Sequence, residues 1–350
     1  MQTWMISPVE LDGLIQQWQK SYAVYVPALS KPATAATDCA PGWRRINAGE
    51  PWTLPVGPTP ASVKSFYFPQ PEILMTFHLE ENHPDKGVMR EPLKSHEMQV
   101  VLGVRPCDAA SVLLNQLPFT EDPLFMAKCQ RTALVGFTCT TRLSTCFCTE
   151  MGGSPHHCAG LDLALSPLQN GFLLEVLSEK GETLVAGCKL VPASESDLAV
   201  LADRRQGQGA TSSYSSQLEV LKACALSRLY DAPMWQELGE ACINCGACTF
   251  ICPTCFCFDM QDEVVQGQGR RIRYWDSCMF PLYSQHTSGH NPRGKKLQRT
   301  RNRFLHKLKY FPDRFGPFSC VGCGRCIGDC PVNIDIREVL NDLVRRTELE

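Results

Sequence analysis

The chain has 350 residues, and its 34 lysines and arginines nearly balance 36 aspartates and glutamates, giving a formal net charge of −2. This length allows two or more domains, and the balanced charge argues against a general affinity for nucleic acid or for a membrane surface. No stretch approaches the ~20 apolar residues that span a bilayer, and the first residues lack the features of a secretory signal. Twenty cysteines without such a signal predict metal thiolates in a reducing, cytoplasmic compartment, not a disulfide framework.

The first hundred residues predict short helices and strands. Ser7-Pro8-Val9-Glu10 is a capping box with proline at the first helical position, so an amphipathic helix is expected over residues 8–20. Short strands are expected at residues 22–26 and 65–69, with an irregular covering loop at 27–62.

Two continuous β-branched runs, residues 98–104 and 132–137, are typical of buried strands. The first leads to Cys107 and Asp108, and Asp108 is expected to cap a helix over residues 109–117. The second leads to Cys139. Two buried strands that each end in a cysteine-bearing loop predict an α/β layer with its chemistry at the strand ends.

The rest of the chain divides at a polar stretch. Residues 171–185 are interpreted as a hairpin closed near Lys180-Gly181, and residues 193–217 have the composition of a linker. We therefore predict an α/β domain over residues 1–215 and a second domain over 216–350. Helices are expected within the second domain at residues 218–230 and 334–346.

Two stretches with identical cysteine spacing dominate the second domain: Cys242 to Pro253 and Cys320 to Pro331. Both read C-x2-C-x2-C-x3-C-P, the run that binds [4Fe–4S] clusters in bacterial-type two-cluster ferredoxins. The first three cysteines of a run bind three irons of one cluster, and the fourth binds the other cluster. The rule assigns Cys242, Cys245, Cys248 and Cys330 to cluster 1, and Cys320, Cys323, Cys326 and Cys252 to cluster 2.

Zinc is the main alternative for these runs, but zinc sites use two separated C-x2-C pairs instead of a three-plus-one run followed by proline. The runs are separated by 66 residues (254–319), far more than a minimal ferredoxin needs. The second domain is therefore predicted to be ferredoxin-like and mostly α-helical, with a long insertion at about residues 259–317.

Four further cysteines form a second constellation, because two follow the buried strands and two lie in the loop beyond the second strand. They are Cys107, Cys139, Cys146 and Cys148. In a parallel sheet both strand ends lie at one edge, so four thiolates could converge there on a third [4Fe–4S] cluster. Zinc and reduced thiols packed as small apolar residues are the alternatives.

Several motifs in order resemble a known family over nearly the whole chain: GVRPCDAAS, CFCTEMGG, CINCGACTFICPTCFCFD, YWDSC, GHNPR and CVGCGRCIGDCP. The order resembles the iron–sulfur β subunit of cytoplasmic heteromeric [NiFe] hydrogenases of the sulfhydrogenase type. The same broad family includes the iron–sulfur subunit of anaerobic sulfite reductase, but the stretch SVKSFYFPQPEIL is closer to the hydrogenase branch. The resemblance implies that Cys107, Cys139, Cys146 and Cys148 bind the third cluster.

The resemblance also implies a function and partners. The chain would relay single electrons between a flavin-bearing NAD(P)-reductase subunit, on one side, and the small and large subunits of a [NiFe] hydrogenase, on the other. In the sulfite reductase branch the partner would instead be a sirohaem subunit. We find no dinucleotide fingerprint, phosphate loop or acid–base pair in this chain, so catalysis is expected on the partners.

Two features leave alternatives open. Cys255, Cys257 and Cys278 fall inside family-like stretches and are either structural thiols or ligands of a further site. Residues 293–309 carry eight lysines or arginines and no acid. They could bind nucleic acid around purely structural clusters, form a solvated helix face, dock an acidic partner, or offset the negative charge of the clusters; we favour the last interpretation.

Overall fold

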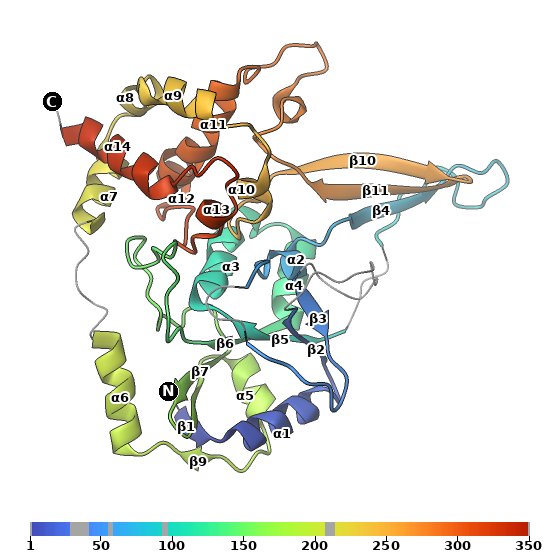
Figure 1. Cartoon of the computed structure of the whole chain (residues 1–350). Helices are drawn as coiled ribbons and strands as arrows, with labels where there is room; N and C mark the ends of the chain where they lie inside the picture. Colours follow the sequence, from blue (N-terminus) through green and yellow to red (C-terminus); the bar gives the residue numbers. More distant parts are fainter. Residues whose placement is uncertain (1, 29–41, 55–58, 93–96, 207–213, 349–350) are drawn as a thin grey trace.

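The computed structural model describes residues 2–28, 42–54, 59–92, 97–206 and 214–348. Within these residues, a mixed eight-stranded sheet occupies the N-terminal half, and helices surround the cysteine runs at the other end of the molecule (Figure 1). The expected α/β character of the N-terminal part is confirmed. None of the helices in the described segments is both long and apolar enough to cross a bilayer.

The large sheet has the strand order β3-β2-β5-β6-β7-β8-β1-β9. Its strands are β1 (Gln2–Ile6), β2 (Ala23–Pro27), β3 (Trp43–Arg45), β5 (Gln99–Val104), β6 (Thr132–Phe137), β7 (Leu163–Leu168), β8 (Gly171–Val176) and β9 (Val191–Pro192). The central strands β2, β5, β6 and β7 are parallel, and the outer pairings are antiparallel. Since β5 and β6 are parallel neighbours, the loops that follow them leave the same edge of the sheet.

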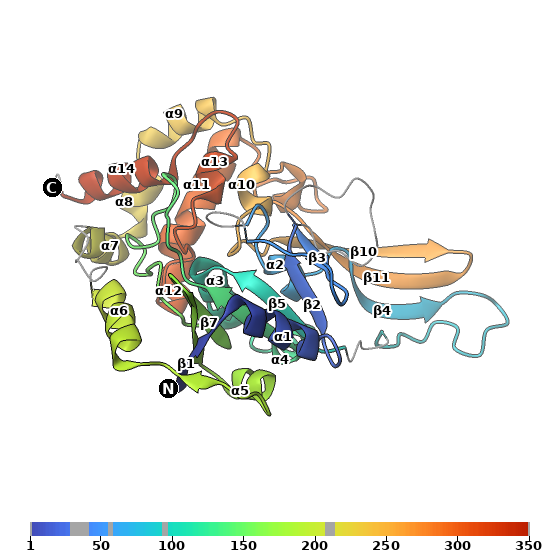
Figure 2. The same ribbon diagram turned by 60° about the horizontal axis from the view of Figure 1, so that its bottom comes forward.

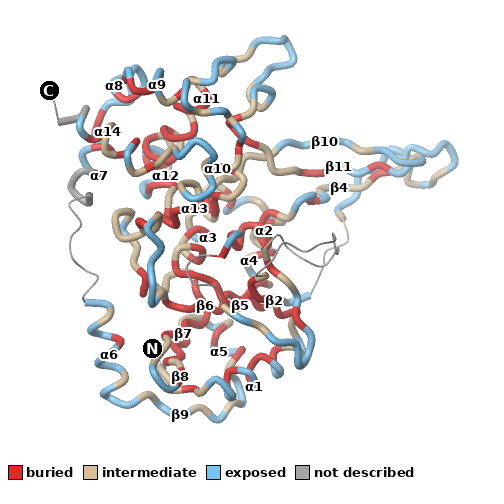
Figure 3. Tube along the Cα trace, viewed as in Figure 1, coloured by how far each residue is buried: buried red, intermediate tan, exposed pale blue. Residues whose placement is uncertain are grey.

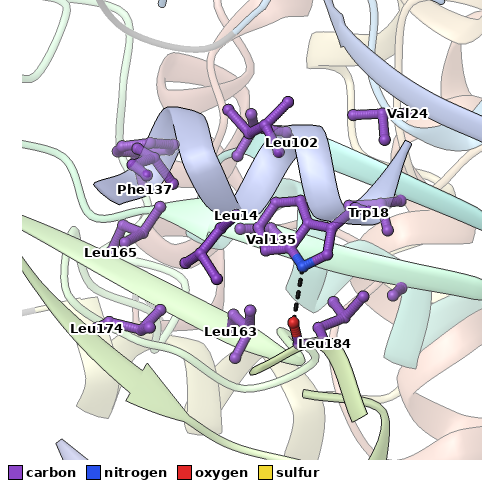
Figure 4. Packing of buried hydrophobic residues seen from close by; sticks show 14 of the residues in the cluster. Leu14, Trp18, Val24, Leu102, Val135, Phe137, Leu163, Leu165, Leu174 and Leu184 are labelled. Atoms are coloured by element: carbon purple, nitrogen blue, oxygen red, sulfur yellow. Dashed lines mark hydrogen bonds between the residues drawn. The ribbon is translucent and has the colours of Figure 1, made fainter. Parts of the chain in front are cut away.

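Helices cover both faces of this sheet. On one face, α1 (Pro8–Trp18) and α5 (Glu179–Val185) pack on alternate residues of the strands, and the indole Nε1 of Trp18 donates to the carbonyl of Leu184 at 2.8 Å (Figure 4). The other face carries α2 (Lys64–Tyr67), α3 (Pro106–Phe119) and α4 (Pro123–Arg131). The two faces form separate apolar cores. Helix α3, which carries Cys107 in its first turn, lies between the sheet and the C-terminal helices (Figures 1 and 3).

Several local expectations hold. The capping box at Ser7 is formed, since Glu10 N donates to Ser7 Oγ at 3.3 Å and Ser7 N donates to Glu10 Oε2 at 2.7 Å. The strands expected at 22–26, 98–104 and 132–137 are β2, β5 and β6. Local capping chemistry and β-branched runs therefore decide these elements.

Other local expectations are wrong. Residues 65–67 lie in helix α2, and Phe68 and Pro69 follow it, because the aromatic side chains of Tyr67 and Phe68 pack against Phe125 of α4. Residues 171–185 are strand β8 followed by α5, whose N-terminus is capped by Ser178. Gly181 does not close a turn; a Cβ there would lie 2.2 Å from the carbonyl of Asp162. Helix α3 begins at Pro106 without a side-chain cap, so Asp108 is inside the helix. The stretch 27–62 contributes strand β3, and its residues 29–41 and 55–58 lie outside the described residues.

The C-terminal helices enclose a core of their own (Figure 2). They are α7 (Tyr214–Ala223), α8 (Leu226–Tyr230), α9 (Met234–Ala241), α11 (Lys296–Leu305), the π-turn η2 (His306–Tyr310), α12 (Phe311–Phe315) and α14 (Ile336–Glu348). The helix expected at 218–230 is therefore two helices, and the closing helix is confirmed as α14, with Ile336, Val339, Leu340 and Leu343 buried. Part of the expected linker forms α6 (Glu195–Gln206), and its residues 207–213 lie outside the described residues.

A second sheet joins distant parts of the chain. The hairpin β10 (Phe258–Val265) and β11 (Gln268–Trp275) comes from the insertion, and β4 (Glu72–His78) from the N-terminal region pairs with β11 (Figure 1). At its base, Glu72 forms buried ion pairs with both Arg273 and Lys128. This sheet ties the insertion to the N-terminal layer.

Candidate metal centres

The first cysteine run forms a tight loop around the short helix α10 (Ala247–Phe250). Gly246 begins this helix at a φ of +78°, a conformation that side-chain-bearing residues rarely adopt. Cys242, Cys245, Cys248 and Cys330 line one cavity with Arg303 and with Cys326, which the spacing assigns to cluster 2. The structure therefore brings together the four thiols predicted to bind cluster 1, three from the first run and one from the second.

The second run is organised in the same way around α13 (Arg325–Gly328), which Gly324 begins at a φ of +76°. Cys320, Cys323 and Cys326 all lie close enough to Cys252 of the first run that its negative charge raises the pKa of each of them. The Sγ of Cys252 accepts a hydrogen bond from Nζ of Lys307 at 3.2 Å. The four thiols predicted to bind cluster 2 therefore also share one region.

The third group of cysteines lies directly against the second run. Cys107 is in the first turn of α3, and its thiol lies close enough to Cys323 and Cys139 that negative charge on either would raise the pKa of Cys107. Cys139 is similarly coupled to Cys146 and Cys148.

The loop that carries Cys146 and Cys148 touches the second run through its backbone. Phe147 N donates to the carbonyl of Gly322 at 2.8 Å. A Cβ on Gly322 or Gly324 would lie within 2.3 Å of a carbonyl oxygen of this loop, so only glycine fits at either position. The four predicted ligands of a third cluster therefore adjoin the predicted site of cluster 2.

Several thiols at the predicted cluster sites hold their protons more strongly than exposed cysteines do. In a cubane each thiolate binds a different iron. Burial raises the pKa of Cys248 to about 11 and those of Cys320 and Cys323 to about 12. Bound iron would favour their deprotonation by supplying the missing positive charge.

Buried cations face these thiols. The ammonium group of Lys307 donates to Cys252 Sγ, to Thr254 Oγ1 at 3.0 Å and to the carbonyl of Ser319 at 3.1 Å, with no carboxylate among these acceptors. Nε of Arg303 is buried and has no hydrogen-bond partner among the described residues. Although burial opposes it, the charges of Cys248 and Cys326 hold the pKa of Arg303 above its usual value. Uncompensated buried cations require nearby negative charge, which two thiolate-bound clusters would provide.

The basic segment is therefore not a solvated helix face. Within residues 293–309, the side chains of Arg299, Arg301, Arg303, Lys307 and Lys309 are buried. The guanidinium of Arg299 donates hydrogen bonds to three backbone carbonyls and to Oδ1 of Asn244 in the first run. The interpretation as local counter-charge fits this arrangement.

Replacing Lys307 with methionine is expected to lower the reduction potential of the cluster that Cys252 is predicted to bind. The native lysine contributes a positive charge and a hydrogen bond to the ligand sulfur, and both favour the reduced state. A unit charge at this distance corresponds to a shift on the order of 100 mV, measured by potentiometric titration with EPR. Lys309→Met is the matched control, because Nζ of Lys309 donates to the carbonyl of Lys222 and pairs with Asp313. An unchanged potential in Lys307→Met would contradict the electrostatic role.

Cys255, Cys257 and Cys278, left open by the sequence, lie close to the predicted ligands. The Cys255 thiol stabilises the thiolate of Cys252, and Cys278 does the same for Cys257, lowering the pKa of Cys257 to about 6. Lys64 lies beside them, donating to the carbonyl of Phe250 at 2.9 Å. In this arrangement Cys255 assists a predicted ligand through a hydrogen bond.

Comparison with known proteins gives two matches. Residues 241–334 match the model of a 4Fe-4S dicluster domain. The sulfhydrogenase 2 subunit beta of Pyrococcus furiosus is 32% identical over 250 residues, which cover 70% of this chain and 73% of that protein. The chain belongs to the sulfhydrogenase β-subunit family. No solved structure is significantly similar to it.

The dicluster domain implies two [4Fe–4S] clusters in this sulfhydrogenase β-subunit homologue. The matched region contains both cysteine runs, the hairpin of β10 and β11, and the basic segment. The chain is thus an iron–sulfur subunit of the hydrogenase type, as the motifs predicted.

One important pair of residues in this β-subunit homologue could not be found from the sequence. The guanidinium of Arg325, inside the second run, donates to both carboxylate oxygens of Asp108 at 2.7 and 2.8 Å, and its Nε donates to the carbonyl of Thr59 at 2.8 Å. Arg325 and Asp108 are almost fully buried. Each is adjacent to a predicted ligand, Cys107 or Cys326, so the pair fixes the second run against α3.

Proposed function

We propose that this chain passes single electrons between the partner subunits of an oxidoreductase complex. Its bound clusters supply reversible one-electron chemistry. The chain holds the predicted ligands in glycine-rich loops and places buried Lys307 and Arg303 beside them. The observation that carries the proposal is that thiols from both runs lie near one another at each predicted site within a domain of dicluster type.

We further propose that Cys107, Cys139, Cys146 and Cys148 bind a third [4Fe–4S] cluster. Support comes from their mutual electrostatic coupling and from the backbone contact between their loop and the second run. A third centre beside cluster 2 would extend the relay from the C-terminal domain to the edge of the large sheet.

The partners follow from the family. We propose hydrogenase small and large subunits on one side of the relay and a flavin-bearing NAD(P)-reductase subunit on the other, in a cytoplasmic complex. The relative from Pyrococcus furiosus is a sulfhydrogenase subunit, which supports a hydrogenase assignment for the present chain. The alternative is the related role in which a sirohaem sulfite reductase subunit is the terminal partner.

Anaerobic purification of the native complex, with metal analysis and mass spectrometry, tests the proposal. Nickel, flavin and hydrogen-dependent dye reduction are expected, together with EPR signals that appear on stepwise reduction. Sirohaem without nickel would replace the hydrogenase assignment by the sulfite reductase role. Clusters that stay in one oxidation state across the accessible potential range would contradict electron relay altogether. In this chain separated from its partners, iron and sulfide for three clusters are expected; two would contradict the third site.

A further inference from the structure

Lys64 is a buried cation that reaches the cysteine runs from the N-terminal half of the chain. It begins α2 and is only 5% exposed. Its ammonium group donates to the carbonyl of Phe250 at 2.9 Å and to that of Thr249 at 3.5 Å, and it lies 4.0 Å from the centre of the Trp275 indole ring. Lys64 therefore joins the N-terminal layer to the first cysteine run and to the base of the hairpin formed by β10 and β11.

The two carbonyls that Lys64 binds lie between predicted ligands of different clusters. Helix α10 ends at Phe250, so its last carbonyls have no amide donor within the helix. Cys248 lies in this helix and Cys252 lies two residues beyond its end, and they are predicted to bind clusters 1 and 2, respectively. By donating to these carbonyls, Lys64 holds the segment of backbone that carries one predicted ligand of each cluster.

The ammonium group of Lys64 has no carboxylate partner among the described residues. Burial lowers the pKa of Lys64, while negative charge on Cys255 and Cys252 opposes that shift. Lys307 reaches Cys252 from the basic segment, so two buried ammonium groups from distant parts of the chain act on the same predicted cluster. Buried cations need nearby negative charge, and an anionic cubane with four thiolates supplies it.

We propose that Lys64 is a positioning residue for the electron relay and that it raises the reduction potential of cluster 2. Its charge favours the reduced, more negative state of the cluster, and its hydrogen bonds hold the segment that leads to Cys252. Cys252, and not Cys248, is among the groups whose charges act most strongly on Lys64, so cluster 1 is expected to respond less. The inference rests on the proposed relay function and adds that the N-terminal layer helps to set how readily cluster 2 accepts an electron.

The test uses the full chain with its clusters, titrated potentiometrically with EPR detection under anaerobic conditions. In Lys64→Met, the ratio of reduced to oxidised cluster 2 at a fixed potential is expected to fall at least threefold, which corresponds to ~28 mV for one electron. Lys64→Gln keeps a donor for the two carbonyls but not the charge, and a similar fall is expected. Lys64→Arg keeps the charge and should restore most of the ratio. Iron and sulfide contents should match those of the parent in all three variants.

Lys128→Met is the matched control, because this lysine is equally buried but its charge is balanced by Glu72. It should change the ratio less than about 1.5-fold. The spectra of Cys252→Ala and Cys330→Ala assign the EPR signals to the two clusters. A parent-like ratio for cluster 2 in both Lys64→Met and Lys64→Gln, an equal fall in Lys128→Met, or loss of iron in both neutral Lys64 variants would overturn the inference while leaving the relay function intact. Clusters that stay in one oxidation state in the parent would refute the relay function and, with it, this inference.

Discussion

Replacing Arg325 with methionine is expected to lower the free energy of unfolding by about 3–5 kcal/mol. The substitution leaves the carboxylate of Asp108 buried without its partner, and removing one member of a buried ion pair costs this much because the remaining charge is uncompensated. It also removes the hydrogen bond from Nε to the carbonyl of Thr59. Denaturant unfolding under anaerobic conditions measures the effect.

A double variant separates the ion pair from simple packing. With Asp108→Leu added to Arg325→Met, no buried charge remains, so most of the lost stability should return. Arg337→Met is a suitable surface control, because its partner Asp335 is partly exposed and such pairs contribute about 0–1 kcal/mol. If the double variant were as unstable as Arg325→Met, an unpaired Asp108 would not be the cause.

Alanine at Cys330 and at Cys252 is expected to remove one cluster each, with loss of about four irons and four sulfides per chain. The two variants should lose different clusters. Cys330 lines the cavity of the first run, so Cys330→Ala should retain the same EPR spectrum as Cys245→Ala. Cys252→Ala should instead match Cys323→Ala, because Cys252 is coupled to Cys323.

This comparison of spectra tests whether each run supplies one ligand to the cluster of the other run. If each fourth cysteine bound the cluster of its own run, Cys330→Ala would match Cys323→Ala instead. Cys188→Ala is the control, since this thiol contacts Gln17 and lies in no motif. Full iron content in Cys330→Ala would show that Cys330 is not a ligand.

Elements governed by neighbours in the chain were predictable from the sequence. The capping box at Ser7 specifies α1, and the β-branched runs specify β5 and β6, because burial on both faces of a parallel sheet selects such residues. The spacing of the two runs indicated that Cys330 of the second run lies with Cys242, Cys245 and Cys248 of the first, and these four line one cavity together with Cys326; their assignment to cluster 1 stays a prediction. These patterns need no knowledge of distant contacts.

Features governed by distant contacts were not predictable. Residues 65–69 are aromatic and β-prone, but packing against α4 makes part of them helical. Asp108 has the position of a helix cap, yet its partner Arg325 is 217 residues away. The composition of the basic segment is compatible with a solvent-facing helix, and only the fold shows that Lys307 reaches Cys252. In each case a long-range partner overrides the local preference.

The shared sheet of β4, β10 and β11 has a consequence for how the chain is made. Strand β4 emerges from the ribosome long before β11, its partner, and at roughly 5–20 residues per second it waits on the order of ten seconds or more. During that time β4 offers unpaired backbone groups and the exposed apolar side chains of Ile73 and Met75. Assembly of this arm therefore belongs to a late stage of biosynthesis, and until then the edges of β4 are open to pairing with other chains.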